Sequence, residues 1–353
     1  MTLRKHIAGF AVTALAAAIP AVAMADVSIY GRAHVSVDFL DDGADYSETN
    51  LSSNSSRLGF KGDHEINPNL TAFFQIEQEI NFSSGSVDSN GQNFATRDTF
   101  VGLKGNFGSA RMGRFDSPFK VARGPANLFG DQLGDMRNLT RVGNARFDER
   151  YENTVEYTTP NMGGFFGVLG YSVQEGTTKD DNLDESVISG SLNYAGDALE
   201  AALAYESADE DTTRGERDGV RAAAAYKITD GFKLVGFYQT IDYTNPAATQ
   251  LVQDSLSGDT FGLGGELKVG SATALKAMWM TRDSDADNYD ADMLTVGIEH
   301  KLDKAVRVYA NYAMVDNDDN VALTPWSQAR SASPAGAAGE EASGFSVGLR
   351  YDF

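Results

Sequence analysis

Residues 344–353 read Gly-Phe-Ser-Val-Gly-Leu-Arg-Tyr-Asp-Phe, and they place large apolar side chains at every second position: Phe345, Val347, Leu349, Tyr351 and Phe353. Small or charged residues fill the intervening positions. Successive side chains of a β-strand point to opposite faces of the sheet, so this stretch predicts a strand with one apolar and one polar face.

The same alternation recurs along the chain, for example at residues 27–39, 72–82, 261–269, 294–300 and 306–314. At residues 231–243 either face could be the apolar one. Seven short turns rich in Gly, Asn and Asp separate these segments. They alternate with eight long connections, at about 40–49, 83–94, 120–150, 175–184, 207–217, 244–257, 283–291 and 316–342. This order predicts about sixteen antiparallel strands.

Sixteen strands with one apolar and one polar face need two different environments. An all-β, transmembrane, up-and-down antiparallel β-barrel provides both, with lipid outside and water inside, and it leaves no open sheet edge. A soluble sandwich or propeller is the alternative, but it would not need short turns at one end and long loops at the other. We therefore expect residues 26–353 to form a single barrel domain.

Residues 1–25 have the pattern of a cleaved signal peptide, with a basic start, an apolar run at 7–19 and small residues before Asp26. The 353-residue chain has no cysteine, which excludes disulfides, Cys-ligated metals and thiol catalysis. Its net charge of −21 argues against a nucleic-acid partner, because phosphate contacts need clustered Lys and Arg. The histidines show no metal-binding spacing and no catalytic motif fits, so we expect neither an enzyme nor a resident metal site.

Several segments resemble the general diffusion porins of Gram-negative bacteria. Residues 27–32 (VSIYGR), 56–62 (SRLGFKG) and 96–105 (TRDTFVGLKG) are similar to early strands of that family, and Tyr351 with the terminal Phe353 resembles its membrane-assembly signal. The resemblance implies a homotrimer of sixteen-stranded barrels in the bacterial outer membrane, with the third long loop folded into the lumen. It also implies contact with lipid, lipopolysaccharide, the barrel assembly machinery and small hydrophilic solutes.

Residues 120–150 form the third long connection and are the expected constriction loop. They carry the acids Asp131, Asp135, Asp148 and Glu149. Alternation predicts a basic wall on the lumen side made of Arg32, Arg57, Arg97 and Arg114. The first three match the family's basic cluster by resemblance, whereas Arg114 is added from alternation alone. Facing charges of opposite sign would set a transverse field across the opening, or they would simply hold the loop to the wall.

Glu77, Glu79 and Glu152 are predicted to form an acidic lumen wall, with Glu152 on the same face as Thr154 and Glu156. This wall suggests a weak preference for cations. Acidic runs in the long loops leave loose binding of Ca²⁺ or Mg²⁺ open, although an EF-hand at 283–294 is excluded by its sequence. Small outward residues on the first strand, Gly31 and Ala33, are expected to pack against neighbouring subunits.

The expected function is passive diffusion of small hydrophilic solutes and ions through a water-filled channel. One alternative is a substrate-selective channel of the same architecture. A sugar channel would need an aromatic ladder, which Trp279 and Trp326 do not make by position. Another alternative is a structural or adhesive barrel with a blocked lumen.

Overall fold

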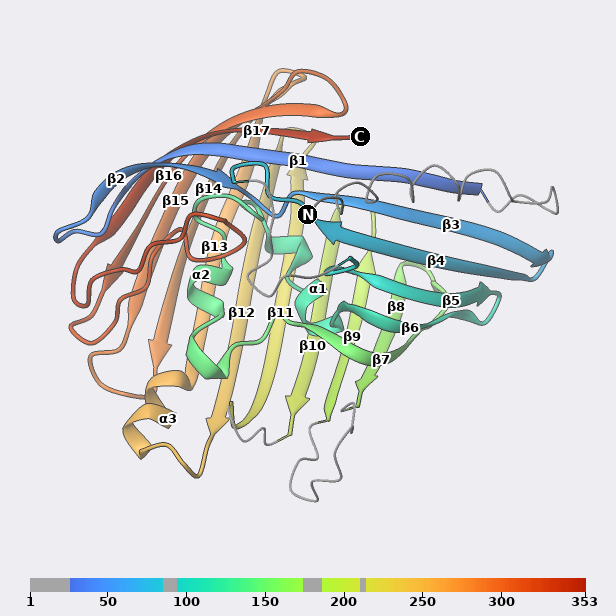
Figure 1. The fold of residues 1–353 in the computed structure, drawn as a ribbon, viewed down its shortest axis with the longest axis horizontal. Helices are drawn as coiled ribbons and strands as arrows, with labels where there is room; N and C mark the ends of the chain where they lie inside the picture. The colour runs from blue at the N-terminus through green and yellow to red at the C-terminus, as the bar shows by residue number, and fades with distance from the viewer. Residues whose placement is uncertain (1–25, 85–93, 174–185, 210–213) are drawn as a thin grey trace, which may run out of the picture.

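A computed structural model describes residues 26–84, 94–173, 186–209 and 214–353 of the chain (Figure 1). The predicted signal peptide, most of the connection at 83–94, all of the connection at 175–184 and residues 210–213 of the acidic run lie outside the described residues.

The described residues form seventeen strands that belong to one sheet. They are β1 (Asp26–Asp41), β2 (Ser47–Ser53), β3 (Arg57–Asn67), β4 (Leu70–Glu79), β5 (Thr99–Gly105), β6 (Gly108–Asp116), β7 (Arg150–Thr158), β8 (Phe165–Ser172), β9 (Val187–Ala195), β10 (Leu199–Ala208), β11 (Glu216–Thr229), β12 (Phe232–Thr244), β13 (Gly258–Val269), β14 (Thr273–Ser284), β15 (Ala291–Lys301), β16 (Val306–Asn317) and β17 (Ala342–Asp352). From β3 to β17 each strand pairs antiparallel with the next along the chain.

β1 closes the sheet into a barrel. One edge pairs with β17, where Val37 lies opposite Val347. The other edge pairs with β2 at Val37 and Leu51, and with β3 at Ile29 and Phe60. β2 and β3 are therefore two parts of one barrel strand, and the described residues confirm the predicted closed barrel of sixteen strands.

The interruption between β2 and β3 covers residues 54–56, where Ser55 has a left-handed φ of 55°. The sequence also predicted an irregular connection at about 40–49, and this was too long. β1 continues to Asp41 and β2 begins at Ser47, so only a short bend separates them. The bend is stabilised by Asp42, whose carboxylate accepts hydrogen bonds from the backbone N–H groups of Ala44 and Tyr46.

The faces of the barrel are the reverse of those in a soluble protein. On β17, Phe345 and Val347 are 43% and 47% exposed, whereas Ser346 between them is fully buried. Exposed apolar side chains of this kind occur on strands around the whole barrel. The predicted alternation is thus confirmed, and its outer face suits a lipid environment. No helix among the described residues is long and apolar enough to span a membrane.

The two ends of the chain meet at Gly31. Its backbone N–H donates to the carbonyl oxygen of Phe353 at 2.8 Å, and the N–H of Phe353 donates back at 3.1 Å. A Cβ atom on Gly31 would lie 2.4 Å from the Phe353 ring, so this position has no room for a side chain. The small size of Gly31 thus makes room for the chain's own terminal ring, whereas packing of Gly31 and Ala33 against a neighbouring subunit remains a prediction.

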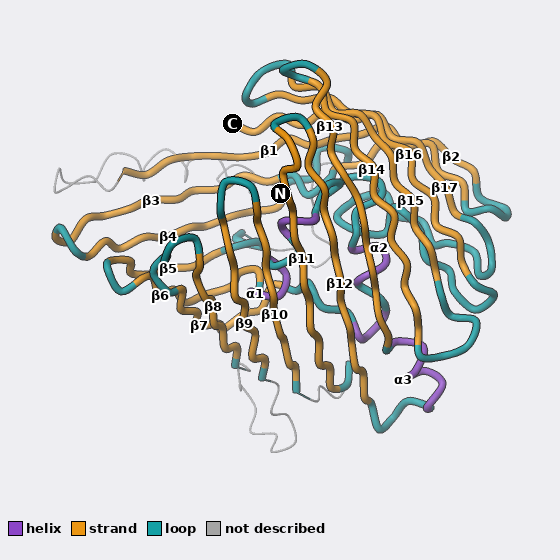
Figure 2. Tube along the Cα trace, turned by 180° about the vertical axis from the view of Figure 1, so that it is seen from behind, coloured by secondary structure: helices purple, strands orange, loops and turns teal. Residues whose placement is uncertain are grey.

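The third long connection, residues 117–149, is the largest addition to the barrel. It contains α1 (Pro118–Val121), α2 (Arg137–Thr140) and two 3₁₀ turns at Gly124–Ala126 and Gly143–Ala145. The Ser117 hydroxyl begins α1 by accepting the N–H of Lys120 at 3.2 Å. A third helix, α3 (Gln250–Leu256), lies in the connection between β12 and β13. Figures 1 and 2 both place α1 and α2 on the same side of β10–β13.

Apolar contacts fix the third connection to the face of the sheet opposite the exposed apolar side chains. Phe129 and Leu139 pack in one buried cluster with Phe237 of β12. Phe119 and Phe147 pack in a second cluster with Ile241 and Tyr243 of the same strand. These contacts explain why the sequence pattern at residues 231–243 did not show which face of the strand was polar. Val235, Phe237, Ile241 and Tyr243 are apolar because they pack against the third connection. Gln239 between them is buried as well and donates to the carbonyl of Thr140 at 3.0 Å.

Candidate functional site

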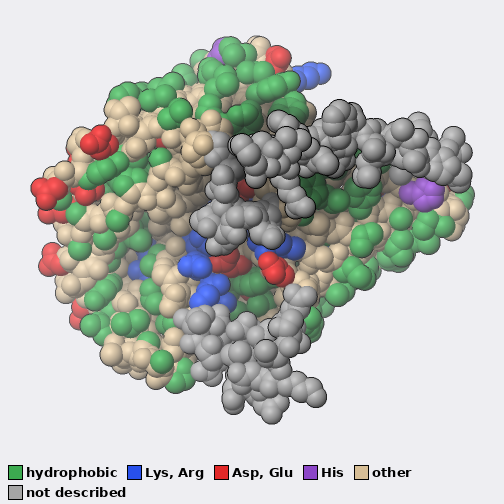
Figure 3. Space-filling model, viewed as in Figure 1, with side chains coloured by type: hydrophobic (Ala, Val, Ile, Leu, Met, Phe, Trp, Pro, Cys, Tyr) green, Lys and Arg blue, Asp and Glu red, His purple; other side chains and the backbone are tan. Residues whose placement is uncertain are grey.

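A polar cavity of about 340 Å³ lies beside the third connection and is lined mainly by charged side chains. Its nine basic lining residues are Arg32, Arg57, Arg97, Arg114, Lys120, Arg123, Arg137, Arg141 and Arg150. Its four acidic ones are Asp116, Asp131, Asp148 and Glu149. Ser55, Gln328 and Ala329 complete the lining. Figure 3 shows Lys, Arg and acidic side chains gathered in the hollow of this face.

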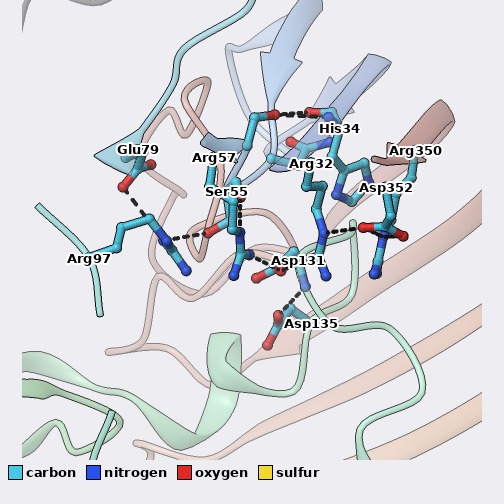
Figure 4. Close-up of polar contacts among 12 residues, drawn as sticks. Arg32, His34, Ser55, Arg57, Glu79, Arg97, Asp131, Asp135, Arg350 and Asp352 are labelled. Carbon is cyan, nitrogen blue, oxygen red and sulfur yellow. Dashed lines mark hydrogen bonds and ion pairs between the residues drawn. The ribbon is translucent and has the colours of Figure 1, made fainter. Parts of the chain in front are cut away.

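Three of the predicted wall arginines stand side by side in this cavity (Figure 4). Arg32 comes from β1 and Arg57 from β3, whereas Arg97 lies two residues before β5. Arg32 donates to Asp131 at 3.0 Å and to Asp352 of β17 at 2.9 Å. Arg57 approaches the same Asp131 oxygen at 3.4 Å. The three arginines thus come from the N-terminal part of the chain, and Asp352 near the C-terminus holds Arg32 in place.

Arg114 also lines the cavity, but regular alternation does not explain its position. Met112 is exposed on the outer face, so an unbroken strand would also turn Arg114 outward. The pairing of β6 with β7 shifts register between Gly113 and Phe115, and Gly113 has φ +145°. This irregularity re-aims the side chain, as β-bulges commonly do.

The predicted acidic wall carries little free negative charge. Glu77 is buried and binds Arg97 at 2.6 Å and Arg57 at 3.7 Å, while it also accepts the hydroxyl of Tyr30. Glu79 approaches Arg97 at 3.7 Å, and Glu152 binds Arg114. Each of these acids is thus matched by an arginine of the basic wall.

Glu152 does not share the environment predicted for it. Thr154 and Glu156 are buried, and Glu156 pairs with Arg111, but the side chain of Glu152 is 63% exposed. The prediction assumed regular alternation along β7. Asn153 instead has a left-handed φ of 49°, and the register shift opposite Gly113 leaves one extra residue here.

Asp131 is the predicted loop acid that pairs directly with the wall arginines. Its second oxygen accepts from Arg137 at 3.0 Å. Burial opposes its ionisation, but Arg137, Arg57 and Arg32 together hold the pKa of Asp131 well below its ordinary value. Asp131 has a left-handed φ of 60°. Strained backbone of this kind in a non-glycine residue is common at functional sites.

The other predicted loop acids bind elsewhere. Asp135 is buried, pairs with Arg137 at 2.7 Å and accepts the backbone N–H of Asp131. Glu149 is shared by Arg141, Arg146 and Arg214. Despite burial, these cations lower the pKa of Glu149. Asp135 and Glu149 therefore shape the third connection rather than face the basic wall.

Asp148 forms the most buried ion pair of this region. Arg221 of β11 donates to it at 2.6 and 3.2 Å, and Arg123 approaches at 3.3 Å. The Arg221 guanidinium also lies over the Phe119 ring, 4.1 Å from its centre. Burial acts against the charge of Asp148, but Arg221 and Arg123 hold its pKa well below the ordinary value.

Sequence reasoning missed several residues that complete the site. Lys120 and Arg150 meet at Asp116, and Arg150 also binds Asp98. Arg221 could have been found, because it is a basic residue at an inward position among alanines. Gln328 gave no signal, since it lies in a polar loop more than 170 residues from the third connection.

Two further predictions concern metals and assembly. Among the described residues, no group of three or more His, Asp or Glu side chains is arranged to hold a metal ion. Tyr351 and Phe353 lie on the outer face of the barrel end, and their rings are tilted at 43° to each other with centres 5.4 Å apart. Their proposed part in membrane assembly remains a prediction.

A porin family and two known porins are similar to this chain. A family model described as Gram-negative porin matches residues 11–320. Outer membrane porin protein 32 of Delftia acidovorans is 30% identical over 370 residues, covering 99% of this chain and 100% of the relative. The solved structure of an anion-selective porin from Comamonas acidovorans has a TM-score of 0.76 and 26% identity, covering 94% of this chain and all of that one.

A third comparison concerns the fold alone. The trimer form of OmpT from Vibrio cholerae has a TM-score of 0.68 at 18% identity, covering 93% of this chain and 99% of that one. Together these findings agree with the sixteen-stranded barrel and its polar interior. The chain belongs to the Gram-negative porin family, whose members are passive channels of the outer membrane and not enzymes.

Proposed function

We propose that this protein is a water-filled diffusion channel for small hydrophilic solutes that prefers anions, and that the third connection narrows it. The observation that carries the proposal is the cavity beside that connection, where nine basic side chains face four acidic ones. Lined by one dominant sign of charge, a confined opening concentrates ions of the opposite sign. The partly buried position of these arginines reduces the screening of their field by salt.

The preference for cations expected from the sequence is opposed by this geometry. That expectation counted Glu77, Glu79 and Glu152 as free acids, but each of them pairs with an arginine. None of these three acids lines the cavity itself, whose lining includes nine basic and four acidic side chains. The name of the Comamonas neighbour, an anion-selective porin, supports the same direction.

The alternatives are less well supported. The described residues that line the cavity include no aromatic side chain, Trp279 is exposed on the outer face and Trp326 is buried in the last connection. This disfavours an aromatic ladder for sugars. A blocked structural barrel would not explain why so many charged groups line an open cavity.

We further propose a homotrimer in contact with outer-membrane lipid and lipopolysaccharide, inserted by the barrel assembly machinery after removal of residues 1–25. The trimer form of the OmpT neighbour supports the oligomeric state. Loose Ca²⁺ or Mg²⁺ binding at the acidic loops is also a proposal. Electrophoresis of unheated and boiled samples tests the trimer, since a monomer-sized band in both would contradict it.

Planar-bilayer recording of the purified protein in a potassium chloride gradient tests the main proposal. We expect stable open channels whose reversal potential shows that chloride permeates better than potassium. A reversal potential of the opposite sign would restore the cation preference. Absence of channel steps from correctly folded protein would instead favour the structural barrel.

A further inference from the structure

The last long connection, residues 318–341, contributes to the cavity as well. Within it, residues 325–331, which we call the strap, bring Gln328 and Ala329 into the cavity lining. Ala329 has a left-handed φ of 61°, so the backbone turns sharply at this point. This part of the chain follows β16 and is remote in sequence from the third connection.

The strap is bonded to the third connection along several residues. The backbone N–H of Gly134 donates to the carbonyl of Pro325 at 2.7 Å. Asn138 of α2 accepts the hydroxyl of Ser327 at 2.9 Å and the backbone N–H of Gln328 at 3.0 Å. Arg141 then donates to the side-chain oxygen of Gln328 at 3.1 Å. These bonds fix the Gln328 side chain at the edge of the cavity.

The other end of the strap is bonded to the wall. Arg330 forms an ion pair with Asp38 of β1, and both side chains are fully buried. Ser346 of β17 donates to the same carboxylate at 2.6 Å. Ser331 donates from its backbone to the carbonyl of Ser53 at 3.0 Å. A pair buried to this degree, with its oxygens satisfied, holds the strap in one position because separating it would expose uncompensated charge.

Apolar packing supports the same arrangement. Trp326 is fully buried in a cluster with Leu40 of β1 and Leu133 of the third connection. Its indole N–H donates to the carbonyl of Pro334 at 2.8 Å, so the ring leaves no polar atom unsatisfied. The strap is therefore a packed part of the barrel interior.

We propose that the strap is a second wall of the constriction, in which Gln328 sets the width of the opening while the arginines set its charge preference. The inference rests on the proposed channel function and adds a size-determining residue to it. Gln328 and Ala329 are uncharged, and Arg330 is neutralised by Asp38 outside the cavity lining. The strap thus limits the cross-section without adding to the field that selects anions.

Substitution of Gln328 tests whether this residue sets the width of the opening without affecting its charge preference. Gln328→Ala should raise the single-channel conductance and speed liposome swelling with neutral sugars near the size limit, with no change in reversal potential. Gln328→Trp should lower both. Gln250→Ala and Gln250→Trp are matched controls, because Gln250 begins α3 and bonds to Asp254 away from the cavity. Equal conductance in wild type and both Gln328 variants would overturn the inference.

A second design releases the whole strap. The double variant Asp38→Asn with Arg330→Gln removes both charges together, so no unpaired ion is left buried. We expect a larger rise in conductance than for Gln328→Ala, and the same reversal potential. A wild-type conductance in this double variant would contradict the anchoring role. Failure of the channel proposal is distinguishable, since it would show in the wild-type protein as silence or as preference for cations.

Discussion

The third connection is attached to the barrel at two carboxylates that look alike in sequence and differ in the structure. Asp148 and Asp131 both lie in left-handed backbone and both bind several guanidinium groups. The side chain of Asp148 is fully buried, and its partner Arg221 is buried with it between aromatic rings. Asp131 keeps 17% of its side chain exposed at the cavity, among arginines that stay partly accessible.

This difference separates two roles for an ion pair: fixing the position of the third connection and influencing which ions pass. At Asp148 the ion pair is removed from water, so its main effect is on the position of the third connection. At Asp131 the carboxylate lines the cavity, and in the channel proposed above it would offset part of the positive field that a permeating ion meets. The same chemical pair thus has different consequences, because burial decides whether a charge acts on the fold or on the solute.

The largest expected effect comes from breaking the buried attachment. Arg221→Met leaves Asp148 without its main partner, and we expect a loss of about 3–5 kcal/mol in the free energy of unfolding. Urea titration of the detergent-solubilised protein, followed by unheated electrophoresis, measures it.

Arg146→Met is the matched control, because Arg146 is 41% exposed and its pair with Glu149 should contribute at most about 1 kcal/mol. Equal free energies of unfolding for the two variants would show that the buried pair at Asp148 stabilises the fold no more than the exposed pair at Glu149.

Acidification tests both attachments together. Arginines hold the pKa of Asp131 and Asp148 below the value of about 3.9 that aspartate has in an unfolded chain. The stabilisation by each carboxylate is therefore complete above the unfolded pKa and is lost as the pH falls through the folded one. Stability and conductance should stay constant from pH 7 to about 4.5 and decline at lower pH. Release of the third connection with a midpoint above about pH 5 would disagree with these pKa directions.

The exposed attachment should affect selectivity more than stability. Asp131→Asn removes one of four cavity acids and leaves Arg32, Arg57 and Arg137 their other partners, Asp352, Glu77 and Asp135. We expect the chloride-to-potassium permeability ratio to rise about two- to fivefold, equivalent to roughly 0.4–1 kcal/mol. Reversal potentials measure the change. A destabilisation as large as that of Arg221→Met would show that Asp131 also holds the third connection.

The smallest effect is expected at an exposed pair beside the cavity, Arg114 with Glu152. Their side chains are 35% and 63% exposed, so water and salt screen their charges. Arg114→Gln should lower the anion preference and Glu152→Gln should raise it, each by less than about twofold. Both shifts should vanish in 1 M salt, where the screening length is about 3 Å. Shifts that persist there would place this pair in the desolvated part of the opening.

Much of the fold could be predicted, because alternation with period two depends only on the geometry of a strand. It gave the number of barrel strands, the order of short and long connections and the outward side of residues such as Phe345 and Val347. It gave the wrong environment for Glu152, which lies at the register shift between β6 and β7, because a single extra residue reverses the alternation. It was ambiguous along 231–243, since a strand that packs against an inner connection has two apolar faces.

The candidate site was predicted in part. The wall arginines and the importance of the third connection followed from charge and length, but the identity of each ion pair did not. Glu77 and Glu152 looked like free acids until their arginine partners were located. The strap gave no usable signal, because nothing local in a polar loop indicates which side of a barrel it will fold toward.

The sequence by itself determined the barrel, its outward face and the stock of charges available to its interior, since these depend on residue order and strand geometry. Tertiary structure decided which charges remain uncompensated. Arg32 and Asp352 are 320 residues apart and Arg330 and Asp38 are 292 apart, yet each pair meets inside the barrel. In the proposed channel, ion selectivity would depend on the charges left after such pairing. Pairing between remote segments is fixed only when the barrel closes and its connections pack.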